Sequence, residues 1–441
     1  MWTLSSLCYN KFIVSFPGNE VNSVLKRIVV RYESGASSVA LMEDGRLAEF
    51  FVEQPAEGER AGNIYKGRVV NVLPGMQAAF VDIGLRKNAF LYIDDLLPVH
   101  LEKKPKVKPS ITELVREGQE ILVQVRKEPL GTKGARVTTH FTLPGRWLVL
   151  LPHADYVAVS RKIESEPERT RLKQIGMQIK PPGDGIIIRT VAENECQESL
   201  QKDMAILGDI WAGLERRAAV AEAPALLYRD LGMIPRLVRD LFSDSVEELV
   251  IDDGRSANEI GAQICAMAPE LQDRVKVYEG PEPVLQHYGI EEQLERAYRR
   301  KIWLENGAYL VIDPTEALTV IDVNTGKYTG TVDLEQTVFE TNMEAAEEIA
   351  RLLRLRDMGG MVIVDFIDMA EERHRRLVTD KLETCMKKDR TKVQVVGWTK
   401  LGLVEITRKK VRPALDELLT ESCSHCGGTG RAPIKHRPGH A

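Results

Sequence analysis

Two aspartates and an asparagine stand at the ends of apolar runs in the second half of the chain. Asp322 and Asn324 end the run Leu-Thr-Val-Ile-Asp-Val-Asn, and Asp365 ends the run Met-Val-Ile-Val-Asp. If these runs are neighbouring strands, the two carboxylates lie close together and need a cation, a shared proton or a basic partner. Oxygen ligands without a nearby histidine favour magnesium, or manganese, over zinc. Such an ion can activate water and screen the charge that develops on a phosphodiester.

The neighbours of this pair differ in what they could contribute. Asn324 is two residues beyond Asp322, so in a strand it points to the same side and could orient a carboxylate, a water or a phosphate. Asp368 is at odd spacing from Asp365 and is expected to face the other way, and Asp313 is expected at a hairpin turn. A single strand-end aspartate is most simply a solvated carboxylate or a helix cap. Two such aspartates with an asparagine beside them favour a catalytic, metal-binding role instead.

The segments around the pair predict a strand, a crossover helix and a second strand. Apolar residues are continuous in the two runs but follow helical spacing over 334–356. Runs rich in Val and Ile are typical of inner strands that are covered on both faces. Gly359-Gly360 opens the second run, so we expect a turn there.

Composition indicates a soluble globular protein of several domains. The 441 residues are 43% hydrophobic and 28% charged. A net charge of −5 gives no general attraction to nucleic acid, so any such binding must come from local basic patches. No apolar run is long enough to span a membrane. Six scattered cysteines, and a first segment (1–25) without a secretory signal, predict a reducing cytoplasmic location.

Residues 59–140 predict a small all-β barrel of the OB type, because short apolar runs alternate there with Gly and Pro. The expected strands are Ile64–Leu73, Met76–Val81, Ala89–Ile93 and Glu120–Lys127. Phe80 and Phe90 lie on adjacent strands. Barrels of this type bind single-stranded nucleic acid by stacking bases on exposed aromatic rings along a basic face. Burial of both rings in the barrel core is the alternative.

Basic residues accompany this predicted barrel. They are Lys66, Arg68, Arg86, Lys87 and Lys133, together with the lysine tract in 103–108. The tract, which is interrupted by proline, is most simply a solvated loop.

Two further basic signals lie outside the barrel. Arg189 and Thr190 follow a buried Ile-Ile-Ile run, and a guanidinium beside a hydroxyl is a plausible clamp for a phosphate, with Arg161-Lys162 as support. A surface arginine beside a helix-capping threonine is the alternative. The segment Arg408–Arg412 carries four cations that could also hold phosphates.

Cys423 and Cys426 have the spacing of half a tetrahedral zinc site. The other cysteines are isolated in the sequence, so the site closes only if a second subunit brings its own pair. His425 could be a third ligand, although its place inside the Cys-x-x-Cys turn makes this awkward. The alternative is a reduced, metal-free pair.

Read together, these segments resemble the ribonuclease E/G family over Lys26 to Arg431. The motifs that carry the resemblance are Asn63-Ile-Tyr-Lys-Gly-Arg, Ala78-Ala-Phe-Val-Asp-Ile-Gly, Lys133-Gly-Ala-Arg-Val-Thr-Thr, Ile188-Arg-Thr, Glu316-Ala-Leu-Thr-Val-Ile-Asp-Val-Asn, Leu353-Arg-Leu-Arg-Asp-Met-Gly-Gly, Val364-Asp-Phe-Ile-Asp-Met and Cys423-x-x-Cys-x-Gly-Thr-Gly. No single motif would identify the family, but their number and order are specific.

The resemblance implies an α/β multidomain fold. A degenerate RNase H-like domain (26–58 and 232–297) would receive two insertions, an OB-fold RNA-binding barrel (59–140) and a 5′-sensor domain (141–231). A DNase I-like catalytic domain (298–419) and a zinc-link (420–431) would follow, with an N-terminal extension (1–25) and a tail (432–441) at the ends. Longer members of the family continue past the zinc-link with a small assembly domain and a scaffold tail, so we expect a dimer and no scaffold here.

The resemblance also implies roles for individual residues. Asp322 and Asp365 match the catalytic aspartates that bind Mg²⁺, and Asn324 matches the asparagine beside them. The remaining matches concern binding: Phe80, Phe90 and Lys133 with RNA, Arg189 and Thr190 with a 5′-monophosphate, and Cys423 and Cys426 with a Zn²⁺ shared between two subunits of a homodimer.

The implied reaction is hydrolysis of single-stranded, A/U-rich RNA by an endoribonuclease that uses magnesium and prefers 5′-monophosphorylated substrates. It leaves a 5′-phosphate and a 3′-hydroxyl and serves RNA decay and the processing of ribosomal and transfer RNA. An RNA-binding regulator without nuclease activity is one alternative, although a binder has no need of a paired acidic site that repels phosphate. A metal-dependent phosphodiesterase acting on DNA is another, because base stacking tolerates either sugar.

Overall fold

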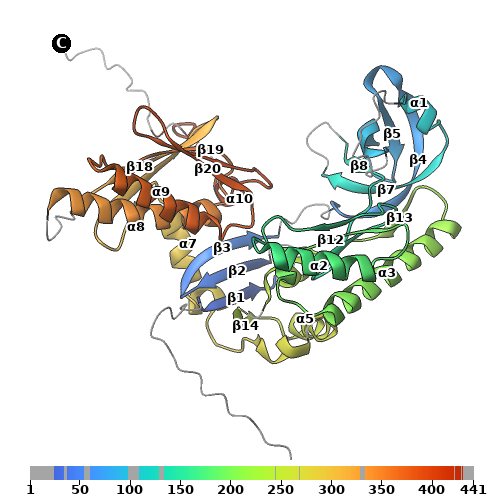
Figure 1. The fold of residues 1–441 in the computed structure, drawn as a ribbon, viewed down its shortest axis with the longest axis horizontal. Coiled ribbons are helices and arrows are strands. Elements are labelled where there is room, and N and C mark those ends of the chain that lie inside the picture. The colour runs from blue at the N-terminus through green and yellow to red at the C-terminus, as the bar shows by residue number, and fades with distance from the viewer. Residues whose placement is uncertain are drawn as a thin grey trace, which may run out of the picture.

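The computed structural model describes residues 24–33, 37–53, 60–97, 109–128, 134–243, 245–267, 269–327, 333–421, 423–428 and 430. Within these residues the strands gather into separate sheets, each with its own helices. A barrel lies at one end of the molecule and a sheet containing β18, β19 and β20 lies at the other, with the sheet of β1, β2 and β3 between them (Figure 1).

The middle sheet has the strand order β15-β14-β1-β2-β3. Its strands are β1 (Lys26–Arg31), β2 (Ser38–Glu43), β3 (Arg46–Val52), β14 (Val246–Ile251) and β15 (Val275–Val277). Asp44 and Gly45 both have positive φ and form the tight turn between β2 and β3. The helices of this region are α4 (Met233–Leu241), α5 (Gly254–Met267), α6 (Val284–His287) and α7 (Ile290–Tyr298). The chain thus leaves this sheet after β3 and returns to it at β14.

The barrel is closed, because β4 pairs with both β5 and β7. Its strands are β4 (Ile64–Leu73), β5 (Ala78–Asp82), β6 (Ala89–Tyr92), β7 (Glu120–Lys127) and β8 (Arg136–Thr138), and β13 (Ala225–Tyr228) adds to the outer edge of β4. The short helix α1 (Ile111–Leu114) precedes β7. This closed barrel fits the OB-like unit predicted from the sequence.

A smaller sheet, in the order β11-β12-β10-β9, follows the barrel. Its elements are β9 (Leu143–Pro144), β10 (Leu148–Leu151), β11 (Val157–Val159), β12 (Gly185–Ile188), α2 (Glu166–Ile179) and α3 (Gln197–Val220). Ser165 caps α2 by accepting a hydrogen bond from the N–H of Glu168. The core of this unit joins the sheet to the inner faces of both helices.

The last sheet has the order β16-β17-β18-β19-β21-β20. Its elements are β16 (Lys301–Trp303), β17 (Tyr309–Pro314), β18 (Leu318–Asn324), β19 (Gly360–Asp365), β20 (Val393–Trp398), β21 (Val404–Arg408), α8 (Leu334–Leu355), α9 (Glu372–Met386) and α10 (Leu415–Leu419). β18 and β19 are parallel neighbours joined through α8, so the predicted strand, crossover helix and strand are confirmed.

Helices α8 and α9 cover one face of this sheet (Figure 1). Alternate residues such as Leu310, Ile321 and Val364 are fully buried on that face. The same apolar core continues into the middle sheet through Val29 and Phe50, and the middle sheet has a second core that includes Ile28, Val30 and Leu249. The expectation that both faces are covered is wrong for the described residues, because Asp322 and Asp365 on the opposite face are exposed. None of the described helices is long and apolar enough to span a membrane.

Candidate active site

The two aspartates singled out from the sequence lie directly opposite each other. In the parallel register of β18 and β19, Asp322 is the partner of Asp365. Parallel strands present their carboxyl ends at the same edge of a sheet, so the last residue of β19 meets Asp322 near the end of β18. The sequence-based expectation that the carboxylates are neighbours is therefore confirmed.

The electrostatics of this pair are those of two negative charges held together. Partial burial, the charge of Asp322 and the charge of Asp368 raise the pKa of Asp365 above its usual value. Asn324 donates a hydrogen bond from Nδ2 to Oδ2 of Asp322, at 2.8 Å. Among the described residues no Lys, Arg or His forms an ion pair with Asp322 or Asp365, so their repulsion is not relieved within this part of the chain.

Asp368 follows the end of the strand, so its odd spacing from Asp365 does not decide which way it faces. β19 ends at Asp365, so the alternation of a strand does not extend to residue 368. The charge of Asp368 contributes to the raised pKa of Asp365, which places it in the electrostatic environment of the pair. Asp313, in contrast, lies within β17 and forms a bidentate ion pair with Arg300, at 2.5 and 2.7 Å. Its charge therefore has a basic partner, whereas those of Asp322 and Asp365 have none within the described residues.

The loop after Asp365 is held by a residue that the sequence analysis did not identify. Asn342 is fully buried in α8; its Nδ2 donates to the carbonyl of Ile367 (2.8 Å) and its Oδ1 accepts from the N–H of Ile367 (3.1 Å). Glu335, in the first turn of the same helix, accepts from the N–H groups of Ala370 and Glu371. A polar residue at a buried helical position was the signal available in the sequence.

The donors at this edge suit a hard cation. Mg²⁺ commonly binds proteins through one or two carboxylates and keeps several of its waters. Asp322 and Asp365 provide two carboxylates without a basic partner in the described chain, and the amide of Asn324 is adjacent. Among the described residues no group of three or more His, Cys, Asp or Glu is arranged to hold a metal, so a site made entirely of protein ligands, as in structural zinc centres, is not formed here.

On the barrel, Phe80 and Phe90 are direct cross-strand partners. Their ring centroids are 5.9 Å apart in an edge-to-face arrangement, and both side chains are half-buried rather than fully enclosed in the core. Arg136 on β8 is the parallel partner of Phe90, a neighbour that the sequence pattern did not predict. The predicted contact residue Lys133 and the 103–108 tract lie outside the described residues.

Part of the predicted basic face of the barrel is neutralised. Glu120 forms ion pairs with Arg68 (2.9 Å) and Lys66 (3.0 Å), and hydrogen bonds from these two side chains lower the pKa of Glu120 to about 2. Lys66 also donates to the carbonyls of Ala218 and Ala221. Lys66 therefore joins the barrel wall to the end of α3, whereas Arg68 pairs within the wall.

Arg189 and Thr190 are adjacent at the end of β12, as predicted, and each has a polar partner. Arg189 donates to the carbonyl of Gly145 (2.7 Å) and forms an ion pair with Asp240 of α4 (2.7 Å). Burial raises the pKa of Asp240, but contacts with arginines outweigh this effect and the net shift is downward. The hydroxyl of Thr190 is 2.7 Å from that of Ser160. A 5′-phosphate at this position would share Arg189 with Asp240.

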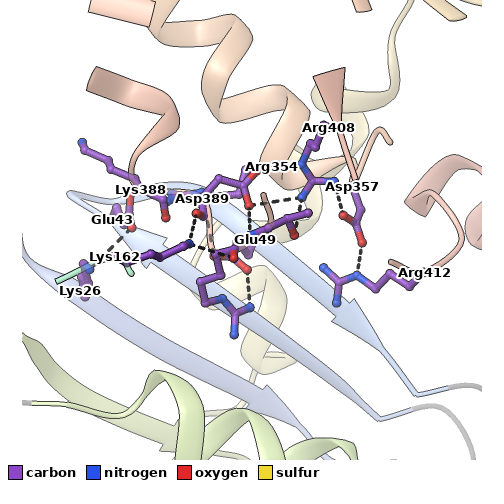
Figure 2. A network of polar contacts seen from close by, with 12 residues as sticks. Lys26, Glu43, Glu49, Lys162, Arg354, Asp357, Lys388, Asp389, Arg408 and Arg412 are labelled. Atoms are coloured by element: carbon purple, nitrogen blue, oxygen red, sulfur yellow. Dashed lines mark hydrogen bonds and ion pairs between the residues drawn. The ribbon is translucent and has the colours of Figure 1, made fainter. Parts of the chain in front are cut away.

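The predicted phosphate patch in 408–412 is partly wrong. Figure 2 shows the guanidinium of Arg408 between Asp389 (2.7 Å) and Asp357, with Arg412 on the second oxygen of Asp357. Arg408, Asp357 and Asp389 are all buried. Two of the cations in this segment therefore stabilise the fold, and the sequence could not separate them from exposed Lys409 and Lys410.

A wide cleft in the described part of the molecule lies away from the carboxylate pair. It has a volume of about 1140 Å³ and lies between β3, the barrel, α4 and the segment 389–418. Cations including Arg390, Lys392 and Lys409 line it. The active-site candidate is instead an open strand edge.

Cys423 and Cys426 form a tight turn, in which the N–H of Gly427 donates to the carbonyl of Cys423 at 2.8 Å. Hydrogen bonds from the backbone of Cys426 and His425 lower the pKa of the Cys423 thiol and favour the thiolate, the form that binds zinc. Within the described chain nothing completes a set of four ligands.

Comparison with known proteins places this arrangement in a family. The sequence model of the ribonuclease E/G family matches residues 142–411. The chain is 43% identical to Ribonuclease G of Salmonella typhimurium (strain SL1344), over 91% of this chain and 83% of that protein. It is 44% identical to Ribonuclease G of Haemophilus influenzae, over 89% and 81% of the two chains. Ribonuclease E of Escherichia coli (strain K12) is 37% identical over 89% of this chain and 37% of its own length. The chain belongs to the ribonuclease E/G family.

Proposed function

We propose that this protein hydrolyses single-stranded RNA in a magnesium-dependent reaction at Asp322 and Asp365. As a member of the ribonuclease E/G family it is an endoribonuclease that acts in RNA processing. The proposal concerns the metal, the residues that hold it and the substrate. The observation that carries it is the direct pairing of Asp322 with Asp365 on an exposed strand edge.

Asp322 and Asp365 would hold the Mg²⁺, which when bound supplies a Lewis acid and an activated water. Manganese would suit the same oxygen donors. Asn324 fixes one oxygen of Asp322 through its 2.8 Å hydrogen bond and leaves the other free to bind. Asn342 keeps the loop after Asp365 in place, so the second carboxylate is positioned by a buried residue rather than by solvent. The expected products carry a 5′-phosphate and a 3′-hydroxyl.

The paired, half-buried rings of Phe80 and Phe90, which keep part of their surface open to solvent, support single-stranded RNA as the substrate. A barrel holds an unpaired strand by stacking bases on such rings, and a duplex does not offer its bases in this way. We include Lys133 in this surface from the sequence alone. A preference for A/U-rich segments, and roles in RNA decay and in ribosomal and transfer RNA processing, follow from the family resemblance.

A preference for 5′-monophosphorylated RNA rests on Arg189 and Thr190. A guanidinium beside a hydroxyl suits a terminal phosphate, and the loop that contacts Thr190 also reaches the catalytic unit, where Lys162 donates to the carbonyls of Asp389 (3.1 Å) and Arg390 (3.0 Å). Arg189→Ala should reduce the ratio of cleavage rates on monophosphorylated and triphosphorylated RNA. An unchanged ratio would refute the sensor assignment.

A homodimer joined by Zn²⁺ is proposed for Cys423 and Cys426. Each subunit brings two thiols, so two subunits would supply the four ligands of a tetrahedral site. We expect half a zinc ion per chain, and monomers after Cys423→Ser. Absence of zinc, or a dimer that survives Cys423→Ser, would contradict the shared site. A reducing cytoplasm, which keeps such thiols free for a metal, is the location we propose.

Removal and replacement of the metal tests the nuclease proposal. Protein treated with a chelator should not cleave a single-stranded A/U-rich RNA, and Mg²⁺ or Mn²⁺ should restore cleavage. A DNA oligonucleotide of the same sequence should not be cut. Cleavage without any divalent ion would contradict the metal site, and binding without cleavage under every metal condition would favour an RNA-binding regulator.

A further inference from the structure

An aromatic pair, exposed Trp303 and half-buried Tyr309, lies on the same sheet edge as the catalytic candidates. Trp303 on β16 is the cross-strand partner of Tyr309 on β17, and Tyr309 is in turn the partner of Asn324 on β18. Directly opposed residues project from the same face of a sheet. Trp303, Tyr309 and Asn324 therefore form a row across three strands.

A second row runs parallel to the first, two residues away along the strands. Lys301 pairs with Val311, Val311 with Asp322 and Asp322 with Asp365. Residues two apart in a strand share a face, so both rows project from the same side of the sheet. The buried side chains of Ile302, Leu310, Ile321 and Val323 occupy the other side, against α8 and α9.

Trp303 is open to solvent, and half-buried Tyr309 lies close to the carboxylates. Trp303 is 54% exposed, an unusual state for so large an apolar side chain. Tyr309 is diagonal to Asp322 on the neighbouring strand, a separation of roughly 7–8 Å. Trp303 is one strand further out, about 10 Å from Asn324 across the two strand spacings.

The rings have a fixed geometry and a cation beside them. Their centroids are 5.2 Å apart at an interplanar angle of 61°. The ammonium of Lys301 lies 3.5 Å from the centroid of Tyr309 and 4.4 Å from that of Trp303. Gly326 packs against Tyr309 from the turn after β18, where a Cβ would come within 3.1 Å of the Tyr309 ring. The ring therefore keeps its place beside the acidic pair.

We propose that Trp303, Tyr309 and Lys301 form a subsite that stacks an unpaired nucleobase beside the scissile phosphate. This inference rests on the proposed function of Asp322 and Asp365. An aromatic face accepts any base, and a lysine next to it suits the phosphate of the same nucleotide. A cation here also offsets the repulsion that the acidic pair exerts on an approaching RNA backbone.

The subsite can be tested with a single-stranded RNA that has one cleavage site and an abasic nucleotide placed in turn at each position around it. Loss of one stacked base should lower kcat/KM roughly 5- to 150-fold. We expect a loss of this size for Trp303→Ala on intact RNA, little loss for Trp303→Phe, and none for the control Val277→Ala, which changes an exposed side chain on a different sheet. At one position the abasic substitution should impair the wild type but not impair Trp303→Ala further.

Other results would overturn the subsite. Abasic penalties that are the same in the wild type and Trp303→Ala at every position would exclude base stacking. Dissociation of the protein into subunits by Trp303→Ala, with unchanged cleavage, would show that the rings contact a second copy of the chain. Binding of the same RNAs to an Asp365→Asn background separates the two proposals: a position-dependent effect of Trp303→Ala on binding supports the subsite even if wild type does not cleave.

Discussion

Two acidic pairs lie at opposite ends of β19, and they use their charge differently. Asp357 precedes the strand and, with Asp389, is bound by the buried guanidinium of Arg408. Asp365 ends the strand and lies opposite Asp322, and both are exposed. The nearby Asn324 donates a hydrogen bond to Asp322. The first pair is neutralised within the fold. The second has no basic partner among the described residues, so its charge remains for a ligand.

This comparison separates structural from chemical carboxylates within one sheet. A buried ion pair needs each of its partners, because removal of one leaves an uncompensated charge in a poorly polarisable interior. Two exposed carboxylates that lie opposite each other on paired strands repel, and this repulsion destabilises their charged forms. Paired carboxylates of this second kind are the ones to examine for metal binding.

The largest effect on stability is expected from the buried pair. Arg408→Ala should lower the free energy of unfolding by about 3–5 kcal/mol, because Asp389 would stay buried without its cation and Asp357 would keep only Arg412 among the described cations. Lys409→Ala changes the exposed neighbour and should stay within about 0.5 kcal/mol of the wild type. The midpoint of urea unfolding measures both. Equal midpoints for the two variants would show that the Arg408 network does not stabilise the fold.

A smaller effect is expected from the residue that positions the exposed pair. Asn342→Ala should cost about 1–3 kcal/mol, because the N–H and carbonyl of Ile367 lose their partner. It should also lower kcat at temperatures where the variant is folded, since the loop after Asp365 is no longer fixed. Gln336→Ala, on the same helix, is the control. Full activity of folded Asn342→Ala would remove its positioning role.

The smallest effect is expected in how the stability of the fold depends on pH in metal-free buffer. The pKa of Asp365 is raised in the folded state, so its contribution to stability is complete below the usual aspartate pKa and is lost as pH rises through the folded-state value. Asp365→Asn should therefore gain stability relative to wild type between about pH 4 and neutrality, by less than about 1 kcal/mol.

Asp313→Asn provides a control of opposite sign for that measurement. The hydrogen bonds from Arg300 lower the pKa of Asp313, so its contribution is present above the usual aspartate pKa and lost as pH falls. Melting temperatures across this pH range should diverge in opposite directions for the two variants. Parallel curves would mean that Asp365 is not destabilised by its negative neighbours.

The sequence was sufficient where local pattern determines structure. Continuous runs of Val and Ile around a helical segment predicted β18, α8 and β19, and the alignment of parallel strand ends then placed Asp322 beside Asp365. The Asp44-Gly45 turn between β2 and β3 has the same local origin.

Long-range contacts explain what the sequence could not predict. The sequence pattern does not distinguish Arg408 from Lys409. Only Arg408 is buried, because Asp357 and Asp389 contact it in the fold. Lys66 and Arg68 lose their free charge because barrel closure pairs β4 with β7 and sets Glu120 opposite Arg68. Trp303 is exposed because α8 and α9 cover the other face of its sheet. The alternation of side chains along a strand does not show which face the helices cover.

The most direct test of the account is cleavage of a short, 5′-monophosphorylated, single-stranded A/U-rich RNA in the presence of Mg²⁺ by Asp322→Asn, Asp365→Asn and Asp313→Asn. All three substitutions remove one negative charge with little change in shape, so they differ only in where the charge was. We expect the first two to bind RNA and to lose about 100-fold or more of their cleavage rate, and Asp313→Asn to cleave as the wild type does. Wild-type cleavage by Asp322→Asn or Asp365→Asn would contradict the assignment of this pair as the catalytic centre.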